Sequence, residues 1–361
     1  MSAGRSDRMR TALAIGLAAT AFLPAAATAQ SDGKSFRDWT AGCDNLKSCA
    51  ALSLPEDGAD TVGYLKLERP GGPTGAASLS LKLVGEKLKA PQSVRLSLDG
   101  APFPAAGRTM AAALPDEETA VVAFSEADTA SLIAAARKAT KLSATMAGKS
   151  YTISLAGSVA ALLWIDEQQG RLNTVTALIR KGDAAAGTVP PAPAPPVITA
   201  RPTAAPLDEK AAKALGAALR KHLKTAAPDA CEDNDGATSS PDQAWPLSAT
   251  QQLIGLYCGS GAYNVITGYW TVSGNAMASA RSVAFPRQDD NMLINSDYDP
   301  KTGQISFFAK GRGIGDCGSS GNYAWTGSGF ALTAFTTMGE CRGLPPDDWL
   351  TLFRSEVKVG Q

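Results

Sequence analysis

A proline-rich stretch in the middle of the chain constrains the fold most. Residues 184–206 carry seven prolines, mostly among small residues. Such a stretch has too few large apolar side chains for a core, so we expect an extended polyproline II conformation. The chain of 361 residues is long enough for two domains. We therefore predict domains at 30–183 and 207–361, held tens of ångströms apart by a semi-rigid linker with a rise of roughly 3.1 Å per residue.

Residues 1–29 have the features of a secretory signal. Three arginines, at positions 5, 8 and 10, precede an apolar run over 11–23 that is too short to span a bilayer. Pro24 ends this run, and Ala27-Thr28-Ala29 offers the small residues of a cleavage site. We expect cleavage after Ala29, export to the periplasm or beyond it, and no membrane insertion of the mature chain.

The charge balance argues against several partners. The chain has 34 basic and 34 acidic residues, and the first 29 residues hold three Arg and one Asp, so cleavage leaves a net charge near −2. A chain with this balance has no excess of positive charge to attract nucleic acid or an anionic membrane. We therefore expect neither among its partners.

Six cysteines form an even set, which in an exported chain favours disulfides over thiols or metal ligands. If the domains fold separately, Cys43 must pair with Cys49, and three pairings remain for the other four. Proximity in the sequence favours Cys231 with Cys258 and Cys317 with Cys341.

In the predicted first domain, apolar and polar residues alternate in the way that is typical of half-buried β-strands. Apolar residues alternate with polar ones around Leu79–Leu83, Val94–Leu98 and Tyr151–Leu155, with turns at Asp99-Gly100 and 147–149. Two helices are expected, one capped by Ser125 with Asp128 three residues later, and one from Ser158 to Gly170. The pattern predicts a β-sandwich-like domain of antiparallel hairpins.

The second domain begins with an amphipathic helix and continues as strands. Leu207, Ala211, Leu215, Leu219 and Leu223 recur every four residues, and Pro228 ends the helix. Short apolar runs then follow about ten residues apart, over 251–258, 263–272, 276–285, 292–298, 304–310 and 330–335. We expect an antiparallel meander, and for the whole chain an α+β fold that is mainly antiparallel β.

His222, the only histidine, lies on the polar flank of this helix beside Lys221. A Ser-His-Asp triad would have to use it, yet the chain has no Gly-x-Ser-x-Gly elbow. We interpret His222 as structural or solvated and name no catalytic residue.

Residues 313–318 match the Gly-x-Gly-x-x-Gly pattern of dinucleotide-binding loops. No helix is expected after them, so no helix N-terminus would hold a pyrophosphate. We interpret this stretch as a glycine-rich loop pinned by a disulfide and expect no cofactor.

Two acidic segments have the spacing of a calcium loop, over 297–303 and 232–235. A tight turn explains Asp299-Pro300 followed by Gly303, and a solvated loop explains the second segment. We expect no metal at either segment.

A contact surface is suggested by Lys310, Arg312, Asp316, Tyr323 and Trp325, which cluster in the sequence around the glycine-rich loop. Aromatic and cationic side chains on a pinned loop suit recognition of a partner. The alternative is that Trp325 belongs to the core and the charges are solvated.

Several short strings have the pattern of a known family. They are residues 36–39, 43–45, Cys49 and 164–171 in the first half, and Cys258, 261–264, 310–318 and 341–343 in the second half. In these strings the chain resembles the exported proteobacterial family named domain of unknown function 1176. The family has no established activity. Its first half is similar to the invasion-associated locus B group, which implies a β-sandwich-like domain. Through Asp299, Gly303, Tyr323 and Trp325 in a strand-turn-strand setting, the second half more loosely resembles small periplasmic β-domains, some of which inhibit lysozyme-type enzymes.

We interpret the chain as a periplasmic, non-enzymatic binding protein whose partner is a protein or glycan of the cell envelope. An inhibitor of cell-wall hydrolases is the first alternative. A carbohydrate-active hydrolase using two carboxylates is the second.

Overall fold

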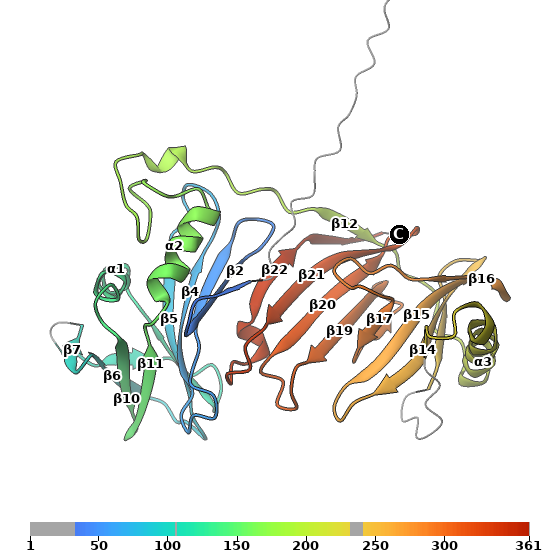
Figure 1. Cartoon of the computed structure of the whole chain (residues 1–361), viewed down its shortest axis with the longest axis horizontal. Helices are drawn as coiled ribbons and strands as arrows, with labels where there is room; N and C mark the ends of the chain where they lie inside the picture. Colours follow the sequence, from blue (N-terminus) through green and yellow to red (C-terminus); the bar gives the residue numbers. More distant parts are fainter. Residues whose placement is uncertain (1–32, 105–106, 232–240, 361) are drawn as a thin grey trace, which may run out of the picture.

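The computed structural model describes residues 33–104, 107–231 and 241–360. The predicted signal segment and the acidic residues 232–235 lie outside the described residues. The chain is mostly antiparallel β with three α-helices in the described part, which confirms the expected α+β class. Figure 1 shows two β-rich halves side by side.

Two sheets form the part of the chain that corresponds to the predicted first domain, and the names first and second domain are kept below for the two predicted parts. One has the strand order β1-β2-β3-β4-β5-β9, and the other has β11-β10-β6-β7 with β8 paired to β6. The strands are β1 (Lys34–Ser35), β2 (Trp39–Cys43), β3 (Cys49–Ser53), β4 (Gly63–Arg69), β5 (Ser78–Val84), β6 (Gln92–Leu98), β7 (Ala101–Phe103), β8 (Met110–Ala112), β9 (Thr119–Ala123), β10 (Lys141–Met146) and β11 (Lys149–Ser154). Leu81, Leu96 and Ile153, from both sheets, belong to one buried core, as expected for a sandwich-like domain.

Two helices cover this domain. Helix α1 (Glu126–Ala135) begins after Ser125, whose hydroxyl accepts from the Asp128 amide at 3.1 Å, so the predicted cap is confirmed. Helix α2 (Ser158–Gln168) ends before Gly170. The φ of this residue is +67°, a left-handed conformation that favours glycine. Helix α2 packs on β2 and β3.

The second domain also has two sheets. One runs β13-β14-β15-β16 with β17 paired to β15, and the other runs β18-β19-β20-β21-β22. The strands are β13 (Gln243–Pro246), β14 (Gln251–Ser260), β15 (Val265–Ser273), β16 (Ala276–Ser282), β17 (Met292–Ile294), β18 (Asp297–Asp299), β19 (Gln304–Lys310), β20 (Gly318–Trp325), β21 (Phe330–Met338), β22 (Leu350–Arg354) and β23 (Glu356–Val359). The six predicted strand regions are all found, whereas β13, β20, β22 and β23 were not predicted.

Helix α3 (Glu209–Ala226) packs on β13, β14 and β16, as its amphipathic pattern predicts. Its buried residues Leu219 and Leu223 contribute to a small core with Trp270. Figure 1 shows α3 at the far end of the molecule from the first domain. Among the described helices, none has both the length and the apolar composition needed to cross a bilayer.

The three disulfides are Cys43–Cys49, Cys231–Cys258 and Cys317–Cys341, so the favoured pairing is confirmed and no cysteine is free. Such a complete set of disulfides is typical of proteins exported to an oxidising compartment.

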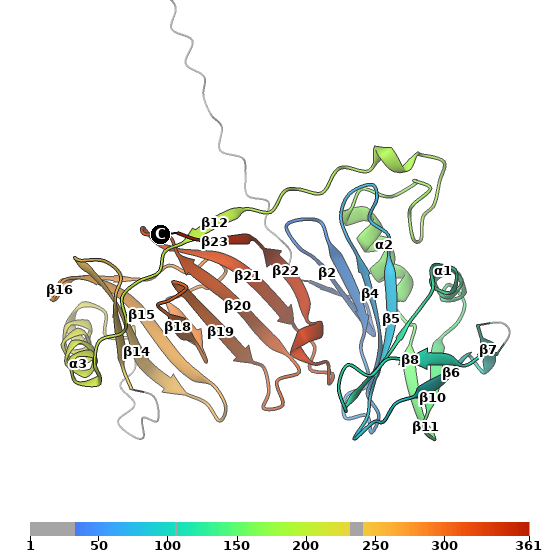
Figure 2. The same ribbon diagram turned by 180° about the vertical axis from the view of Figure 1, so that it is seen from behind.

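The linker does not hold the domains apart. Within it, β12 (Val197–Ala200) pairs in parallel with β23, and the Arg201 amide donates to the Trp325 carbonyl at 2.8 Å. Figure 2 shows this segment running across both halves. The two domains are not separated as expected, because the run Val197–Ala200 has the β-propensity to form a strand. The prolines on both sides of this run obscure that propensity in the sequence.

The two domains share an apolar core at their junction. Leu52 and Tyr64 of the first domain lie in the same buried cluster as Trp349 and Leu352 of the second, and β2 contacts β22. Gly42 allows this close approach, because a Cβ atom there would lie 2.9 Å from Cδ2 of Leu352.

A buried carboxylate also fastens the junction. Asp348, 2 % exposed, accepts hydrogen bonds from the Tyr64 hydroxyl at 2.5 Å and from the ammonium groups of Lys66 at 3.0 Å and Lys82 at 2.6 Å. Burial disfavours the charged carboxylate, but these three donors outweigh it and lower the pKa of Asp348. The junction is therefore held by complementary charges as well as by apolar contacts.

Candidate functional site

The five residues predicted to form a contact surface lie on one β-hairpin. Lys310 ends β19, Arg312 and Asp316 lie in the connecting loop, and Tyr323 and Trp325 lie near the end of β20. The hairpin pairs Lys310 with Gly318 at its loop end and Ile305 with Tyr323 at its other end. The structure therefore brings Lys310, Arg312 and Asp316 together but not the two aromatic residues.

Tyr323 and Trp325 belong to the core. Their exposed fractions are 0 % and 3 %. Tyr323 stacks on Phe307 with 5.8 Å between ring centroids and donates to the Pro286 carbonyl at 2.8 Å. The glycines and serines at the start of β20 conceal the strand in the sequence, and its period-two alternation turns both aromatic residues to the buried face. Neither side chain is accessible as part of a contact surface. The burial of Trp325 agrees with the alternative that this residue belongs to the core.

Arg312 and Asp316 pin the loop. The Arg312 guanidinium donates to both Asp316 oxygens, at 2.8 and 2.6 Å, and the Asp316 carboxylate also accepts from the Gly343 amide at 2.6 Å. Asp316 is 4 % exposed, and its hydrogen bonds with Arg312 hold its pKa below the usual range against the effect of burial. The neighbouring Cys317–Cys341 disulfide attaches the same loop to the same segment. This pair therefore positions the loop.

The loop also reaches the first domain. Arg312 Nη1 donates to Asp57 Oδ1 at 3.2 Å, and Arg342 Nη1 donates to the Pro55 carbonyl at 2.9 Å. The site is thus built where the domains meet, which the expected separation of the domains did not foresee.

Asn264 fixes the start of the loop from a second hairpin. Its amide donates to the Lys310 carbonyl at 2.9 Å, and its side-chain oxygen accepts from Asn295 at 3.0 Å. The adjacent Tyr263 ring lies close to Gly313, where a Cβ atom would be 3.5 Å from Cδ1 of the ring. The loop is therefore supported on both sides.

Two large apolar side chains are exposed on this support. Ile314 is 75 % exposed and Tyr263 is 42 % exposed. Sequence reasoning missed both, although an isoleucine between two glycines was a visible signal. We name Tyr263, Ile314 and the Lys310 and Arg312 side chains beside them the junction loop surface.

An acidic cleft of about 720 Å³ lies next to it at the same junction. Asp38, Glu56, Asp57 and Asp60 of the first domain line it together with Arg342 of the second. Asp57 also pairs with Arg312, so the cleft and the junction loop surface are continuous.

The other sequence candidates have ordinary structural roles. Residues 313–318 lead into strand β20, not into a helix. Asp299 Oδ1 accepts from the Lys301 amide and Oδ2 from the Thr302 hydroxyl, both at 2.9 Å, so this segment forms a tight turn. His222 is half-buried on α3, and no group of His, Cys, Asp or Glu within the described ranges is arranged to hold a metal ion.

Residues 164–171 converge on a buried polar centre in the first domain. Asp166 accepts from the Leu178 and Ile179 amides, each at 2.8 Å, and Arg171 is fully buried. The strings 261–264, 310–318 and 341–343 instead meet at the junction loop surface, through the contacts of Asn264 and Asp316 given above. The residues that carry the resemblance thus fall at two places.

The family match and a curated relative agree with this resemblance. The chain is 29 % identical over 346 residues to "Uncharacterized protein YpfG" of Escherichia coli (strain K12), covering 89 % of this chain and 92 % of that protein. The crystal structure of invasion associated protein B from Bartonella henselae aligns with 39 % of this chain and 99 % of its own, at 18 % identity and a TM-score of 0.29. Residues 33–356 match the family described as "Protein of unknown function (DUF1176)". The chain therefore belongs to this family, as residues 310–318 and the other matching strings predict.

Proposed function

We propose that the protein is a non-enzymatic binding protein of the periplasm that holds a protein of the cell envelope through the junction loop surface. The predicted signal segment and the three disulfides support export. The boundaries 30–183, 184–206 and 207–361 remain part of this proposal.

One observation carries it: Ile314 is 75 % exposed on a loop that a disulfide and a bidentate ion pair hold in place. A loop whose backbone is already held in place loses little conformational entropy on binding. Side chains of this kind act as anchors, and removing one typically costs about 2 kcal/mol or more of binding free energy.

The chemistry around the anchor indicates the partner. Ile314 and Tyr263 offer apolar area, and the adjacent cleft is lined by four carboxylates and one arginine. A complementary surface would have an apolar pocket flanked by basic groups. A protein fits this description better than a neutral glycan does.

An inhibitor of cell-wall hydrolases is the more specific alternative. It is favoured by the same pinned loop, because a rigid loop with an exposed apolar residue at its tip suits insertion into a substrate cleft. Arg312 and Asp316 are poor test positions, since they hold the loop and the junction together.

The test is a pull-down from periplasmic extract containing peptidoglycan, with the full mature chain as bait. The isolated second domain is unsuitable because it would expose Trp349 and Leu352. Ile314→Ser is compared with Val359→Ser, a control in which a side chain that is 57 % exposed is truncated on β23. We expect a protein retained by the native chain and by the control, with affinity for Ile314→Ser lower by roughly 30-fold.

Each other outcome has a distinct meaning. A captured hydrolase that loses activity only with an intact Ile314 would establish the inhibitor form. Retention of peptidoglycan alone would replace the protein partner with a glycan. Equal capture by Ile314→Ser and the native chain would refute the junction loop surface as the site.

A further inference from the structure

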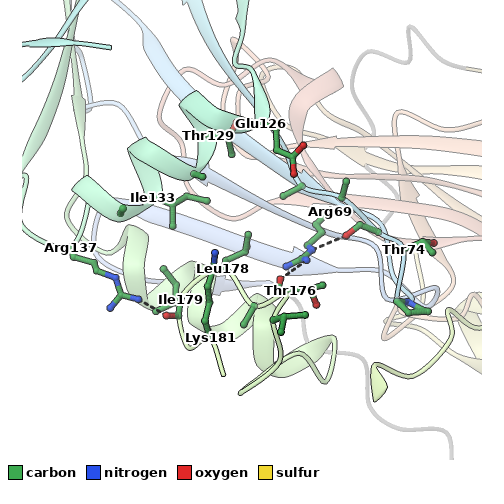
Figure 3. Close-up of a pocket in the computed structure, with 18 residues that line it drawn as sticks. Arg69, Thr74, Glu126, Thr129, Ile133, Arg137, Thr176, Leu178, Ile179 and Lys181 are labelled. Atoms are coloured by element: carbon green, nitrogen blue, oxygen red, sulfur yellow. Dashed lines mark hydrogen bonds between the residues drawn. The ribbon is translucent and has the colours of Figure 1, made fainter. Parts of the chain in front are cut away.

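The first domain contains a cleft that is separate from the junction loop surface. Its volume is about 680 Å³, within the usual range for small-molecule sites. Three segments form it: α1, the loop 73–77 between β4 and β5, and residues 175–181 after α2 (Figure 3).

Arg171 holds two of these walls together. It is fully buried, and its guanidinium donates to the Gly72 carbonyl, to the Gly75 carbonyl at 3.3 Å and to the Thr176 hydroxyl at 3.0 Å. Its Nε donates to Gln169 at 2.9 Å. Because one rigid fork bonds both loops, the cleft is formed before any ligand arrives.

Arg69 lies in the wall of the cleft with incomplete hydrogen bonding. It is 5 % exposed, and it donates to the Gly75 carbonyl at 3.1 Å and the Thr176 carbonyl at 2.7 Å. Its Nη1 has no hydrogen-bond acceptor and faces Asp166 Oδ1 at 3.6 Å. This nitrogen is buried and faces a carboxylate, so Arg69 positions the wall of the cleft by joining Gly75 to Thr176.

Two further cations lie on the cleft without an acidic partner. Within the described part of the chain, neither Arg137 nor Lys181 has a carboxylate within 4.0 Å, and Arg137 donates only to the Ile179 carbonyl. Figure 3 shows Lys181 extending from its loop toward α1. Because Arg69 already faces Asp166, two unpaired cations, Arg137 and Lys181, remain against one acidic residue of the lining, Glu126. The cleft therefore has an uncompensated positive charge.

The remaining lining is largely apolar. Ile133 and Ala130 contribute from α1, and Leu178 and Val175 from the facing segment, with Val175 54 % exposed. Apolar walls beside cationic donors suit a ligand that has an apolar body and one anionic group.

We propose that this cleft binds a small amphipathic anion, with a carboxylate or phosphate held by Lys181 and Arg137 and its apolar part against Ile133 and Leu178. This site does not depend on the junction loop surface. The head group and the apolar body would each contribute to affinity.

The experiment is calorimetric titration of the full mature protein with octanoate and octyl phosphate. Octanol and octylammonium have the same apolar body without the negative charge, and inorganic phosphate tests the head group alone. We expect saturable binding of at least one of the two amphipathic anions and binding of octanol and octylammonium at least tenfold weaker, since a hydrogen bond to a charged group corresponds to roughly 10-fold to 100-fold in affinity.

Lys181→Met is the decisive variant because Lys181 makes no ion pair or side-chain hydrogen bond with the described residues, so its loss should leave folding intact. Lys138→Met, at an exposed lysine outside the cleft lining, is the matched control. We expect Lys181→Met to lower the affinity at least tenfold and Lys138→Met to leave it unchanged.

The proposal would be overturned if octanol bound as tightly as octanoate and octyl phosphate. It would also be overturned by equal affinity in Lys181→Met and the native chain. Absence of binding by both amphipathic anions below about 1 mM would do the same. Binding of inorganic phosphate alone would reject the apolar half of the ligand.

Discussion

Removal of the Asp348 carboxylate should loosen the junction between the domains. In Asp348→Ala, the Tyr64 hydroxyl and the ammonium groups of Lys66 and Lys82 lose their shared acceptor. Loss of one partner from a buried ion pair costs about 3–5 kcal/mol, because the remaining charge is left uncompensated. The two lysine side chains keep 13 % and 22 % exposure and can reach water, so we expect the lower end, about 3 kcal/mol.

Urea unfolding of the mature chain measures this cost. Asp347→Ala is the matched control, because Asp347 is the adjacent residue in the same short helix and is exposed. We expect a large decrease in the free energy of unfolding for Asp348→Ala and a change within about 0.5 kcal/mol for the control. A decrease below about 1 kcal/mol for Asp348→Ala would refute the role given to this carboxylate.

The native protein and Asp348→Ala also allow a test by pH. The pKa of Asp348 is lowered in the folded chain, so its contribution is fully present above the ordinary carboxyl pKa and is lost as the pH falls through the folded value. Below about pH 4, native protein and Asp348→Ala should therefore converge in stability. A gap that stays constant down to acid denaturation would mean that packing, and not charge, accounts for the difference.

Three further perturbations test other parts of the structure. Gly42→Ala places a methyl group 2.9 Å from Leu352 Cδ2 and should lower the melting temperature. An unchanged melting temperature would mean that the junction between the domains can accommodate the added methyl group. Replacing both Cys317 and Cys341 with serine should lower the free energy of unfolding by about 3.5 kcal/mol, because the unfolded chain gains loop entropy. Equal urea unfolding curves for this variant and the native chain would show that the disulfide does not stabilise the fold. Arg171→Lys loses the fork that bonds both loops, so amide hydrogen exchange around residues 72–76 should become faster; unchanged exchange would show that the loops hold themselves.

Local patterns predicted about half of the strands and all three described helices, and β1 to β4, β8, β9 and β12 were also missed. Alternation around Leu81, the Ser125 cap and the Gly170 stop act within a few residues, so the sequence displays them directly. The disulfide pairing followed from proximity because each partner lies within a single domain. These features need no knowledge of distant contacts.

Features that depend on distant contacts were not predictable. Strand β20 was missed because Gly318 and its serine-rich neighbours have low β-propensity, and its pairing with β19 and β21 overrides that preference. The role of Asp348 depends on lysines more than 260 positions earlier in the chain. Our proposal keeps the candidate site on the loop that the sequence analysis chose, whereas the exposure of Ile314 and the burial of Tyr323 depend on how distant strands pack.

The parallel pair β12–β23 links the middle of the chain to its last strand. A chain that is synthesised from its N-terminus contains residues 197–200 well before residues 356–359. The first domain has its strands and disulfide available at that stage, whereas the segment that follows it must wait for the final residues to find its only ladder partner in the described structure. Completion of the fold therefore requires the end of the chain, and loss of the last few residues would release a segment that lies far from them in sequence.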